Sequence, residues 1–438
     1  MPIRDLLVTG IVLVALPFAL RHAYIGVLLW TWISIMNPHR LAWGFAYNAP
    51  FAAIAAGTTL LALFTTRDPV RLPKHPAVYA LIAFVLWMCI TTAVALDPSE
   101  SMTQLTKVLK IQLMTLVGLA VIHERKHIQL FVWINVLSIG YFGAKGGVYT
   151  ILTGGSGKVW GPGGFIGGNN EIGLAIIVAI PLMNFLRHIV ERVWIKHAIL
   201  VVMLLSATAT LGTQSRGALL AIIAMAGLLW LRSPRKLPFG VLIVTAAIAL
   251  AAFMPGEWAD RMRTIQTYEQ DTSAMGRISA WTTMFHLAND RFTGGGFDVY
   301  SSAVFSRYAS DPSMARAAHS IYFQVLGEHG WLGLILFILI WALVWRGAND
   351  LRRQTKDRLE YAWVFMLAGM CQVSLIGYAV GGAFLSLAYY DFPYNVLIIV
   401  VCTQRWLAAE LRRKNEATGR AAPAEPAVMR PGPAGVHP

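Results

Sequence analysis

The sequence has few charged residues and few cysteines for its length. Only 13% of its 438 residues are charged and 56% are hydrophobic, whereas a soluble domain is roughly one quarter charged. So little polar surface cannot cover a water-soluble globule of this size. Its three cysteines, Cys89, Cys371 and Cys402, lie in apolar segments without CxxC or Cys/His spacing, so no disulfide framework or metal site is expected.

Long apolar segments recur along most of the chain, and each is long enough to cross a hydrocarbon core of about 30 Å. Only helices and closed barrels satisfy their backbone groups in lipid. The predicted fold is therefore an all-α integral membrane protein, with about 12 transmembrane helices and one large, mostly helical periplasmic loop. The expected spans are residues 5–36, 49–65, 77–96, 104–122, 128–151, 171–186, 198–214, 216–231, 238–254, 319–345, 360–381 and 389–408.

Basic residues cluster in every second connection between these spans. Because positively charged loops remain cytoplasmic, we expect a multi-pass protein of the bacterial inner membrane with both termini in the cytoplasm. That topology needs an even number of spans, so residues 5–36 are interpreted as one long or broken crossing, interrupted at Arg21–His22. It also explains the net charge of +14 without nucleic acid. The clusters are Arg67/Arg71/Lys74, Arg125/Lys126, Arg187/Arg192/Lys196, Arg232/Arg235/Lys236 and Arg346/Arg352/Arg353/Lys356/Arg358.

This topology divides the chain into four parts. Residues 1–254 are expected to hold helices 1 to 9 with short loops, residues 255–318 the periplasmic loop, and residues 319–410 helices 10 to 12. Residues 411–438 form a cytoplasmic tail. The tail is rich in alanine and proline and has little to bury, so we expect it to be disordered.

The periplasmic loop contains six arginines and no lysine. The planar fork of arginine binds phosphate through two parallel hydrogen bonds and stays charged at any working pH. The loop is therefore predicted to bind a phosphate-bearing ligand at the outer membrane surface. Alternatively, the arginines pair with the seven acidic residues of the same segment. The six are Arg261, Arg263, Arg277, Arg291, Arg307 and Arg316.

Arg216 lies in a short turn between two hydrophobic spans, where a charge is costly unless it is paired or used. It either converges on the loop arginines or extends along the interface as a snorkelling side chain. Lys107, Lys110 and Arg40 are expected near the same outer surface. Each either extends this basic pocket or anchors its own helix at the interface.

His319 is predicted to open a helix directly after the periplasmic loop. A neutral imidazole can take a hydroxyl proton and so act as a general base, and a helix N-terminus lowers the histidine pKa and keeps it neutral. The alternative is a histidine that anchors the helix end. Glu328 and His329 lie deeper along the same helix, where we expect packing and close backbone approach rather than catalysis.

Two further features have simpler alternatives. Asp391 opens the last span among aromatic residues; it either caps the helix or acts as a carboxylate that orients a histidine or binds a hydroxyl-rich acceptor. The glycine-rich run from Gly154 to Lys158 resembles a P-loop, but Val159 stands where that motif requires Ser or Thr. We therefore expect a mobile loop there and no nucleotide.

Taken together, these residues resemble the O-antigen ligase and O-antigen polymerase superfamily. The resemblance rests on many spans, one large outer loop late in the chain, Ser215–Arg216–Gly217–Ala218 before that loop and His319–Ser320–Ile321–Tyr322 closing it. Gly327-Glu328-His329-Gly330 follows. The segment Trp30–Leu41 is similar to the exosortase-associated O-glycosylation ligase branch.

The resemblance implies a GT-C-like glycosyltransferase that works without a metal or another cofactor. It would transfer glycan from an undecaprenyl pyrophosphate donor to an acceptor hydroxyl at the periplasmic face, inverting the anomeric centre. Lipid A-core oligosaccharide is the first expected acceptor, as in an O-antigen ligase; a protein hydroxyl or another glycan chain is the alternative. Arg216 and Arg277 would be catalytic residues that stabilise the leaving pyrophosphate, and His319 the general base.

The expected partners of the protein are the undecaprenyl pyrophosphate-linked glycan donor, the lipid A-core or protein acceptor and membrane lipids, with no nucleic acid and no nucleotide. A transporter or flippase for lipid-linked glycan is the rival function of a different class. It predicts charges deep inside the spans or broken midplane helices, whereas the notable charges here cluster toward the outer face. The expected substrate-binding residues are Arg261, Arg263, Arg291, Lys107, Lys110, Arg40, Tyr322 and Asp391.

Overall fold

A computed structural model describes residues 3–66, 68–253, 255–256, 272–309, 311 and 315–420. Every regular element in these ranges is a helix, which confirms the predicted all-α class. Arg67, Arg261, Arg263 and the tail from residue 421 lie outside the described residues, so their predicted roles stay predictions.

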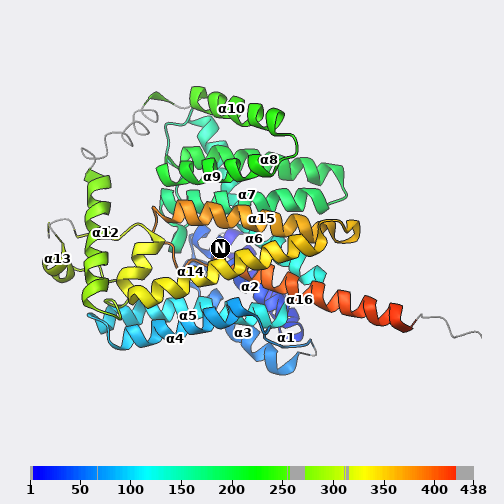
Figure 1. The fold of residues 1–438 in the computed structure, drawn as a ribbon, viewed down its shortest axis with the longest axis horizontal. Coiled ribbons are helices and arrows are strands. Elements are labelled where there is room, and N and C mark those ends of the chain that lie inside the picture. Colours follow the sequence, from blue (N-terminus) through cyan, green and yellow to red (C-terminus); the bar gives the residue numbers. More distant parts are fainter. Residues whose placement is uncertain are drawn as a thin grey trace, which may run out of the picture.

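Most helices run side by side along the long axis of the molecule, and α12 crosses one end of them (Figure 1). The helices before it are α1 (Ile3–Arg21), α2 (Ala23–Met36), η1 (Pro38–Leu41), η2 (Phe45–Asn48), α3 (Phe51–Thr65), α4 (Pro76–Ala93), α5 (Pro98–Val121), α6 (Arg125–Leu152), η3 (Gly164–Ile166), α7 (Asn169–Ile189), α8 (Val193–Gly212), α9 (Arg216–Arg232) and α10 (Lys236–Phe253). The others are α12 (Thr272–Asp290), α13 (Ser302–Tyr308), α14 (Ile321–Thr355), η6 (Leu359–Tyr361), α15 (Ala362–Gly382) and α16 (Asp391–Arg420).

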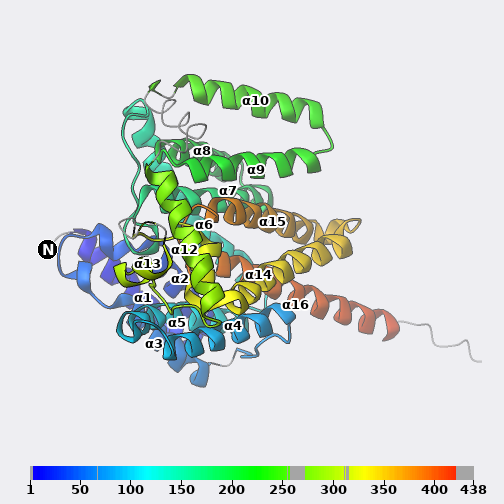
Figure 2. The ribbon, with the colours of Figure 1, turned by 60° about the vertical axis from the view of Figure 1, so that its left-hand side comes forward.

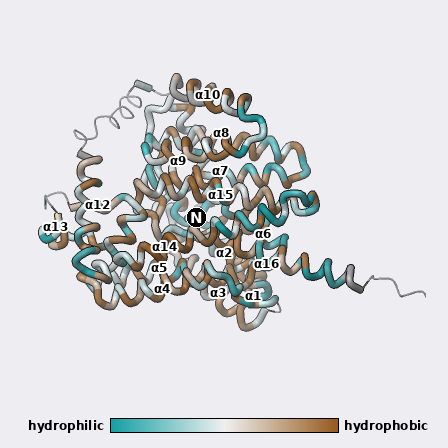
Figure 3. The backbone as a smooth tube through the Cα atoms, viewed as in Figure 1, coloured by the Kyte–Doolittle hydropathy of each residue, from teal (hydrophilic) through white to brown (hydrophobic). Residues whose placement is uncertain are grey.

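Nine helices of the described chain are long and apolar enough to cross a membrane. Shorter apolar helices, α2 and α3, pack beside them. Apolar residues cover the middle of the bundle, and hydrophilic residues gather toward the ends of the helices (Figure 3). These helices support a multi-pass membrane protein, although the expected number of twelve spans is not established by their lengths.

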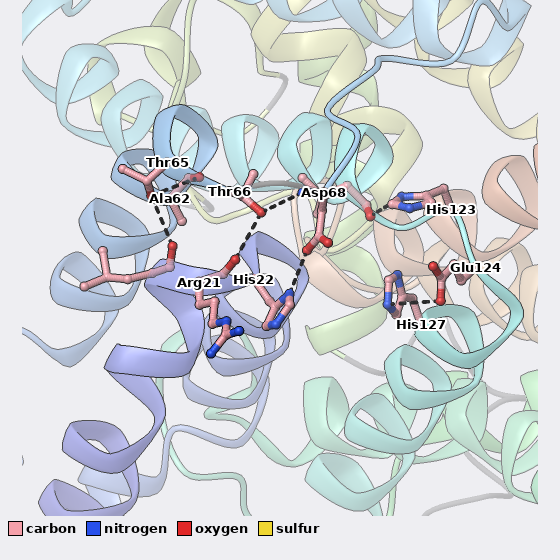
Figure 4. Close-up of polar contacts among 11 residues, drawn as sticks. Arg21, His22, Ala62, Thr65, Thr66, Asp68, His123, Glu124 and His127 are labelled. Atoms are coloured by element: carbon pink, nitrogen blue, oxygen red, sulfur yellow. Dashed lines mark hydrogen bonds and ion pairs between the residues drawn. The ribbon is translucent and has the colours of Figure 1, made fainter.

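Residues 5–36 are interrupted at Arg21–His22, as predicted, and form two antiparallel helices, of which α1 belongs to the nine candidate spans and α2 does not. The number of crossings in this segment stays a prediction. The chain turns at His22, between α1 and α2. The start of α1 returns to the segment after α2, because the Ala46 N–H donates to Asp5 Oδ1 at 2.9 Å. The polar side chain of His22 explains the turn, since its Nδ1 lies 3.1 Å from Asp68 Oδ2 at an end of the bundle (Figure 4).

This hairpin places the two ends of the described chain at opposite ends of the bundle. Asp391 at the start of α16 accepts a hydrogen bond from Ser34, near the end of α2, at 2.6 Å. Arg405, later in α16, donates to carbonyls in the α3–α4 and α5–α6 connections at the other end. Ile3 and Arg420 therefore lie far apart (Figure 2). The cytoplasmic location expected for both termini stays a prediction.

The two ends of the bundle differ in charge. One end, here called the α12 end, carries α12, α13 and the α2–α3, α4–α5, α6–α7, α8–α9 and α15–α16 connections. The other end, here called the basic end, carries the remaining connections. All the predicted basic clusters that the structure describes lie at or beside the basic end, among them Arg125, Arg192, Arg235 and Arg353.

Helix α14 is kinked at Gly330, where φ is 66° and ψ is −170°. The kink lets the loop after α12 approach the helix, since a Cβ added at Gly330 would lie 2.1 Å from the Phe292 carbonyl oxygen. His329 is fully buried beside the kink, and its Nδ1 lies 2.7 Å from Thr91 Oγ1. These contacts support the packing role expected for this segment.

Candidate active site

His319 lies at the α12 end, just before α14. Its φ of 44° is in the left-handed region, which residues other than glycine rarely adopt. The His319 N–H donates to Ser386 Oγ, in the α15–α16 connection, at 3.0 Å. Since α14 begins at Ile321 with Ser320 as its N-cap, His319 precedes the helix rather than opening it. The α15–α16 connection thus supports the backbone turn that directs the histidine.

The electrostatic environment favours a neutral His319. Burial lowers the pKa of His319 below its ordinary value, and the positive charges of Arg277 and Arg316 lower it further. Its Nδ1 is buried and accepts or donates no hydrogen bond among the described residues. The neutral form is what a general base needs. The causes are burial and two arginines, not the helix N-terminus that the sequence suggested.

Arg277 lies in the first turns of α12 and acts electrostatically on two groups. One is His319 and the other is Glu171, in the first turn of α7. The guanidinium therefore lies within electrostatic reach of a candidate base and of a carboxylate. The sequence interpretation missed Glu171. The available signal was an acidic residue in the first turn of an otherwise apolar helix, directly after the glycine-rich loop.

Arg316 packs on α12 at the position of a glycine. A Cβ added at Gly276 would lie 2.3 Å from Cζ of Arg316, so the guanidinium can take this place only because residue 276 has no side chain. Gly276 directly precedes Arg277. Two arginines that are far apart in the sequence are thereby brought to the same helix turn, beside His319.

Trp281 ties this part of α12 to the residue before His319. Its Nε1 donates to the Ala318 carbonyl at 2.7 Å, and its ring stacks on Phe323 with 5.2 Å between centroids. Trp281 lies four residues after Arg277, so both side chains are on the same face of the helix. The tryptophan therefore fixes the separation of Arg277 and His319.

Arg216 is the first residue of α9. The N-cap is Ser215, whose Oγ accepts a hydrogen bond from the Ala218 N–H at 3.2 Å. The preceding turn is held from α7, because Asn169 Nδ2 donates to the Thr213 carbonyl at 2.8 Å. The predicted short turn is confirmed, and its end is joined to the same helix that carries Glu171.

The α15–α16 connection brings Arg216 toward His319. A Cβ added at Gly217 would lie 3.1 Å from Cβ of Phe384, so α9 approaches this connection closely. Two residues further on, Ser386 binds His319. The ring of Phe384 also lies 6.5 Å from that of Trp281. The starts of α9 and α14 and the side of α12 thus converge on one short segment, residues 383–390.

The other predicted substrate contacts have partners elsewhere. Arg291 donates to the carbonyls of Gly294 and Val94, which ties the end of α12 to the α4–α5 connection. The Tyr322 hydroxyl donates to the Ala379 carbonyl at 2.9 Å. Asp391 binds Ser34, as described above, and joins α16 to α2. In the structure these side chains hold helices together.

The remaining basic candidates are on the surface. Lys107 and Lys110 are exposed on α5, and Lys107 donates to Gln104. Arg40 lies over the ring of Tyr47, with 4.6 Å from Cζ to the centroid. The glycine-rich loop is fastened at Val159, whose N–H donates to the Gly212 carbonyl at 3.0 Å. Within the described chain, no group of three or more His, Cys, Asp or Glu side chains could hold a metal ion.

Comparison with known families bears directly on this arrangement. Residues 201–338 match the family model described as O-antigen ligase. These residues form an O-antigen ligase domain. The resemblance to the O-antigen ligase superfamily is thereby confirmed. The domain contains Arg216, Arg277 and His319, the three predicted catalytic residues, whereas Asp391 lies beyond it.

The preceding half of the chain belongs to a different match. Residues 3–191 match a family of unknown function, and this region includes Glu171. No curated protein matches the chain. The similarity of residues 30–41 to the exosortase-associated branch therefore stays a prediction.

Proposed function

We propose that this protein transfers glycan from undecaprenyl pyrophosphate to lipid A-core oligosaccharide, as an O-antigen ligase. The family domain suggests glycan transfer of the O-antigen ligase or polymerase type. The observation that carries the proposal is that the half-buried His319 lies within reach of the charges of Arg277 and Arg316, and that burial and these charges lower its pKa and so favour the neutral form. A base and an anion-binding pair at one place fit a reaction in which a hydroxyl attacks and a pyrophosphate leaves.

In the proposed reaction the acceptor oxygen bonds to the anomeric carbon while the bond from that carbon to the pyrophosphate oxygen breaks. The bonding electrons go to the pyrophosphate, and the hydroxyl proton goes to His319. Arg277 and Arg216 offset the charge that develops on the leaving group, the kind of contribution that is usually largest in such sites. Attack opposite the leaving group inverts the anomeric centre, and cleavage of the bond between the sugar and the pyrophosphate supplies the energy.

The arginines also regulate the base. In the empty site their positive charges lower the pKa of His319, which makes it a weak base. A bound pyrophosphate offsets those charges, because opposite charges within a few ångströms favour the charged form of a neighbouring group. Donor binding therefore raises the pKa of His319 and strengthens the base when the substrate is present.

The distribution of charge supports a periplasmic site. The basic connections are at the end of the bundle opposite to His319, and positively charged connections remain cytoplasmic. The α12 end would then face the periplasm, where lipid-linked glycan and lipid A-core meet. No ATP is needed there, since the donor already carries the energy.

The test is transfer of glycan from an undecaprenyl pyrophosphate donor to lipid A-core by the purified full chain. We expect wild-type activity, and loss of at least about a hundredfold in His319→Ala and in Arg277→Ala. His286→Ala and Arg307→Gln are matched controls, since His286 is exposed on α12 and Arg307 forms an exposed ion pair with Asp290. Both controls should keep wild-type activity.

Other outcomes separate the alternatives. Transfer to a protein hydroxyl or to a second glycan, but not to lipid A-core, would show that the proposed acceptor is wrong, whereas the proposed donor and site would stand. Full activity of His319→Ala would disprove the general-base role. Movement of labelled donor across vesicle membranes without cleavage would identify a flippase instead.

A further inference from the structure

Two arginines at the basic end have no acidic partner among the described residues. Arg232 ends α9, and Arg352 lies near the end of α14. Their positive charges are close enough to repel each other. Among the described residues neither forms an ion pair with a carboxylate, whereas the neighbouring Arg353 pairs with Asp350 at 3.2 Å. Two like charges are thus held together without compensation by this part of the protein.

The pair is held in place by a buried glutamine. Arg352 Nη1 donates to Gln372 Oε1 at 3.3 Å, and the amide of Gln372 donates to Asn349 Oδ1 at 2.7 Å. Gln372 is 0% exposed, so α14 and α15 fix its orientation. The amide also donates to the carbonyl of Trp345, and the ring of Trp345 faces Arg232, 5.7 Å from its Cζ. Trp345 is thus linked to Arg232 by its ring and to Arg352 through Gln372.

Helix α15 forms the floor of this site between α9 and α14 (Figures 1 and 2). The Arg352 guanidinium lies over Phe365, with 4.9 Å from Cζ to the centroid. The guanidinium does not crowd α15 at Gly369, since a Cβ added at Gly369 would lie 3.8 Å from Nε of Arg352. Nη1 of Arg232 and Nε of Arg352 are buried donors, and no described group accepts a hydrogen bond from either atom. Unmet donors on charged groups are costly, which points to an anion.

The position of the two arginines at the basic end indicates which class of anion they bind. Arginines at the cytoplasmic ends of membrane helices lie at the level of the lipid headgroups, and basic pockets between helices there bind anionic lipids. The guanidinium fork matches phosphate oxygens. We propose that Arg232 and Arg352, oriented by Gln372 and Trp345, bind the phosphate of an anionic phospholipid headgroup over α15. Simple snorkelling into water would not require the buried glutamine that fixes Arg352.

Such a lipid has a consequence for the other end of the bundle. Helix α9 begins at Arg216 and ends at Arg232, and α14 follows His319 and carries Arg352. A phosphate between Arg232 and Arg352 holds these two helices in a fixed relation. This consequence rests on the proposed function, but the binding site itself does not.

The test measures lipid binding by the full-length protein in detergent. Phosphatidylglycerol or phosphatidylcholine is titrated, and bound lipid is counted by native mass spectrometry. We expect wild type to retain phosphatidylglycerol and not phosphatidylcholine, and the double variant Arg232→Gln/Arg352→Gln to bind it at least about tenfold more weakly. Arg353→Gln is the matched control, because it removes the same charge one residue away; its binding should equal that of wild type. A double Arg→Lys variant shows whether the fork is needed and should recover part of the affinity.

Each other result counts against the site. Equal binding by the double variant and wild type would overturn it, and so would an equal loss in Arg353→Gln, which would indicate a general effect of surface charge. Inorganic phosphate that competes fully at millimolar concentration, with no preference for phosphatidylglycerol, would identify free phosphate instead of a lipid. If the double variant does not give a monodisperse folded species, the two single variants decide. The proposal is overturned if neither single variant binds phosphatidylglycerol more weakly than wild type.

Discussion

The backbone N–H of His319 donates to Ser386 Oγ at 3.0 Å, and this bond joins the start of α14 to the connection between α15 and α16. It matters because His319 has a φ of 44°, a conformation that persists only where the surroundings hold it. The same connection is pinned again where the Gln324 side chain accepts a hydrogen bond from the Ala388 N–H. Ser386 is thus a positioning residue for the proposed base.

Replacing Ser386 by alanine should lower kcat while leaving the donor KM nearly unchanged. A hydrogen bond of this kind contributes about 1 kcal/mol, so the expected loss in kcat is about five- to tenfold. Ser386→Thr keeps the hydroxyl and should recover most of the activity. Steady-state kinetics with varied donor concentration measure both parameters; a rise in KM with unchanged kcat would contradict the positioning role.

The pH dependence should follow the charge of Arg316. The neutral form of His319 is active, so activity falls as the pH drops through its pKa. Burial and two arginines lower that pKa, which places the acid limb of wild type below the ordinary histidine range. Arg316→Gln removes one positive charge and raises the pKa, so its acid limb should move to higher pH by a few tenths of a unit to about one unit.

Arg307→Gln is the control for that experiment, because Arg307 is paired with Asp290 on the surface. Its pH profile should coincide with that of wild type. An acid limb that stays in place in Arg316→Gln would show that another group controls the pH dependence.

The two kinetic parameters should have different acid limbs in the wild-type enzyme. The pH profile of kcat/KM reports groups of the free enzyme, and that of kcat reports groups of the enzyme–substrate complex. Since bound pyrophosphate offsets the arginine charges, the pKa of His319 is expected to be higher in the complex. The acid limb of kcat should therefore lie at higher pH than that of kcat/KM. Coincident limbs would mean that the donor does not neutralise the arginines.

The sequence predicted the helical membrane class, because long apolar runs have a direct physical meaning, whereas the catalytic roles of Arg216, Arg277 and His319 stay predictions. It could not predict that residues 5–36 fold back at His22. An apolar pattern interrupted by one polar pair fits both a broken helix and a hairpin, and contacts between distant segments, such as the hydrogen bond from the Ala46 N–H to Asp5 Oδ1, distinguish them.

The finer parts of the site depend on contacts between distant segments. The charge of Arg316, whose guanidinium lies against Gly276, acts on His319, and the charge of Arg277 acts on Glu171 at the start of α7. Neither pairing has a sequence spacing that reveals it. Conversely, Arg291 and Tyr322 had suitable chemistry, but each donates to a distant backbone carbonyl, of Val94 and of Ala379, that only the fold brings close.

Gly276→Ala tests whether the place of Arg316 on α12 matters. The new Cβ would lie 2.3 Å from Cζ of Arg316, so the guanidinium must move away from the helix. Gly227→Ala in α9 is the matched control, because nothing lies within 4 Å of its added Cβ, and alanine there favours the helix by up to about 1 kcal/mol. We expect the acid limb to shift to higher pH in Gly276→Ala, as in Arg316→Gln, and to stay in place in Gly227→Ala. Because a loss of folding would lower activity at every pH, only the position of the limb separates displacement of Arg316 from general damage. If the acid limb of an active Gly276→Ala enzyme stays in place, the contact of Arg316 with α12 at residue 276 is not needed for its effect on His319.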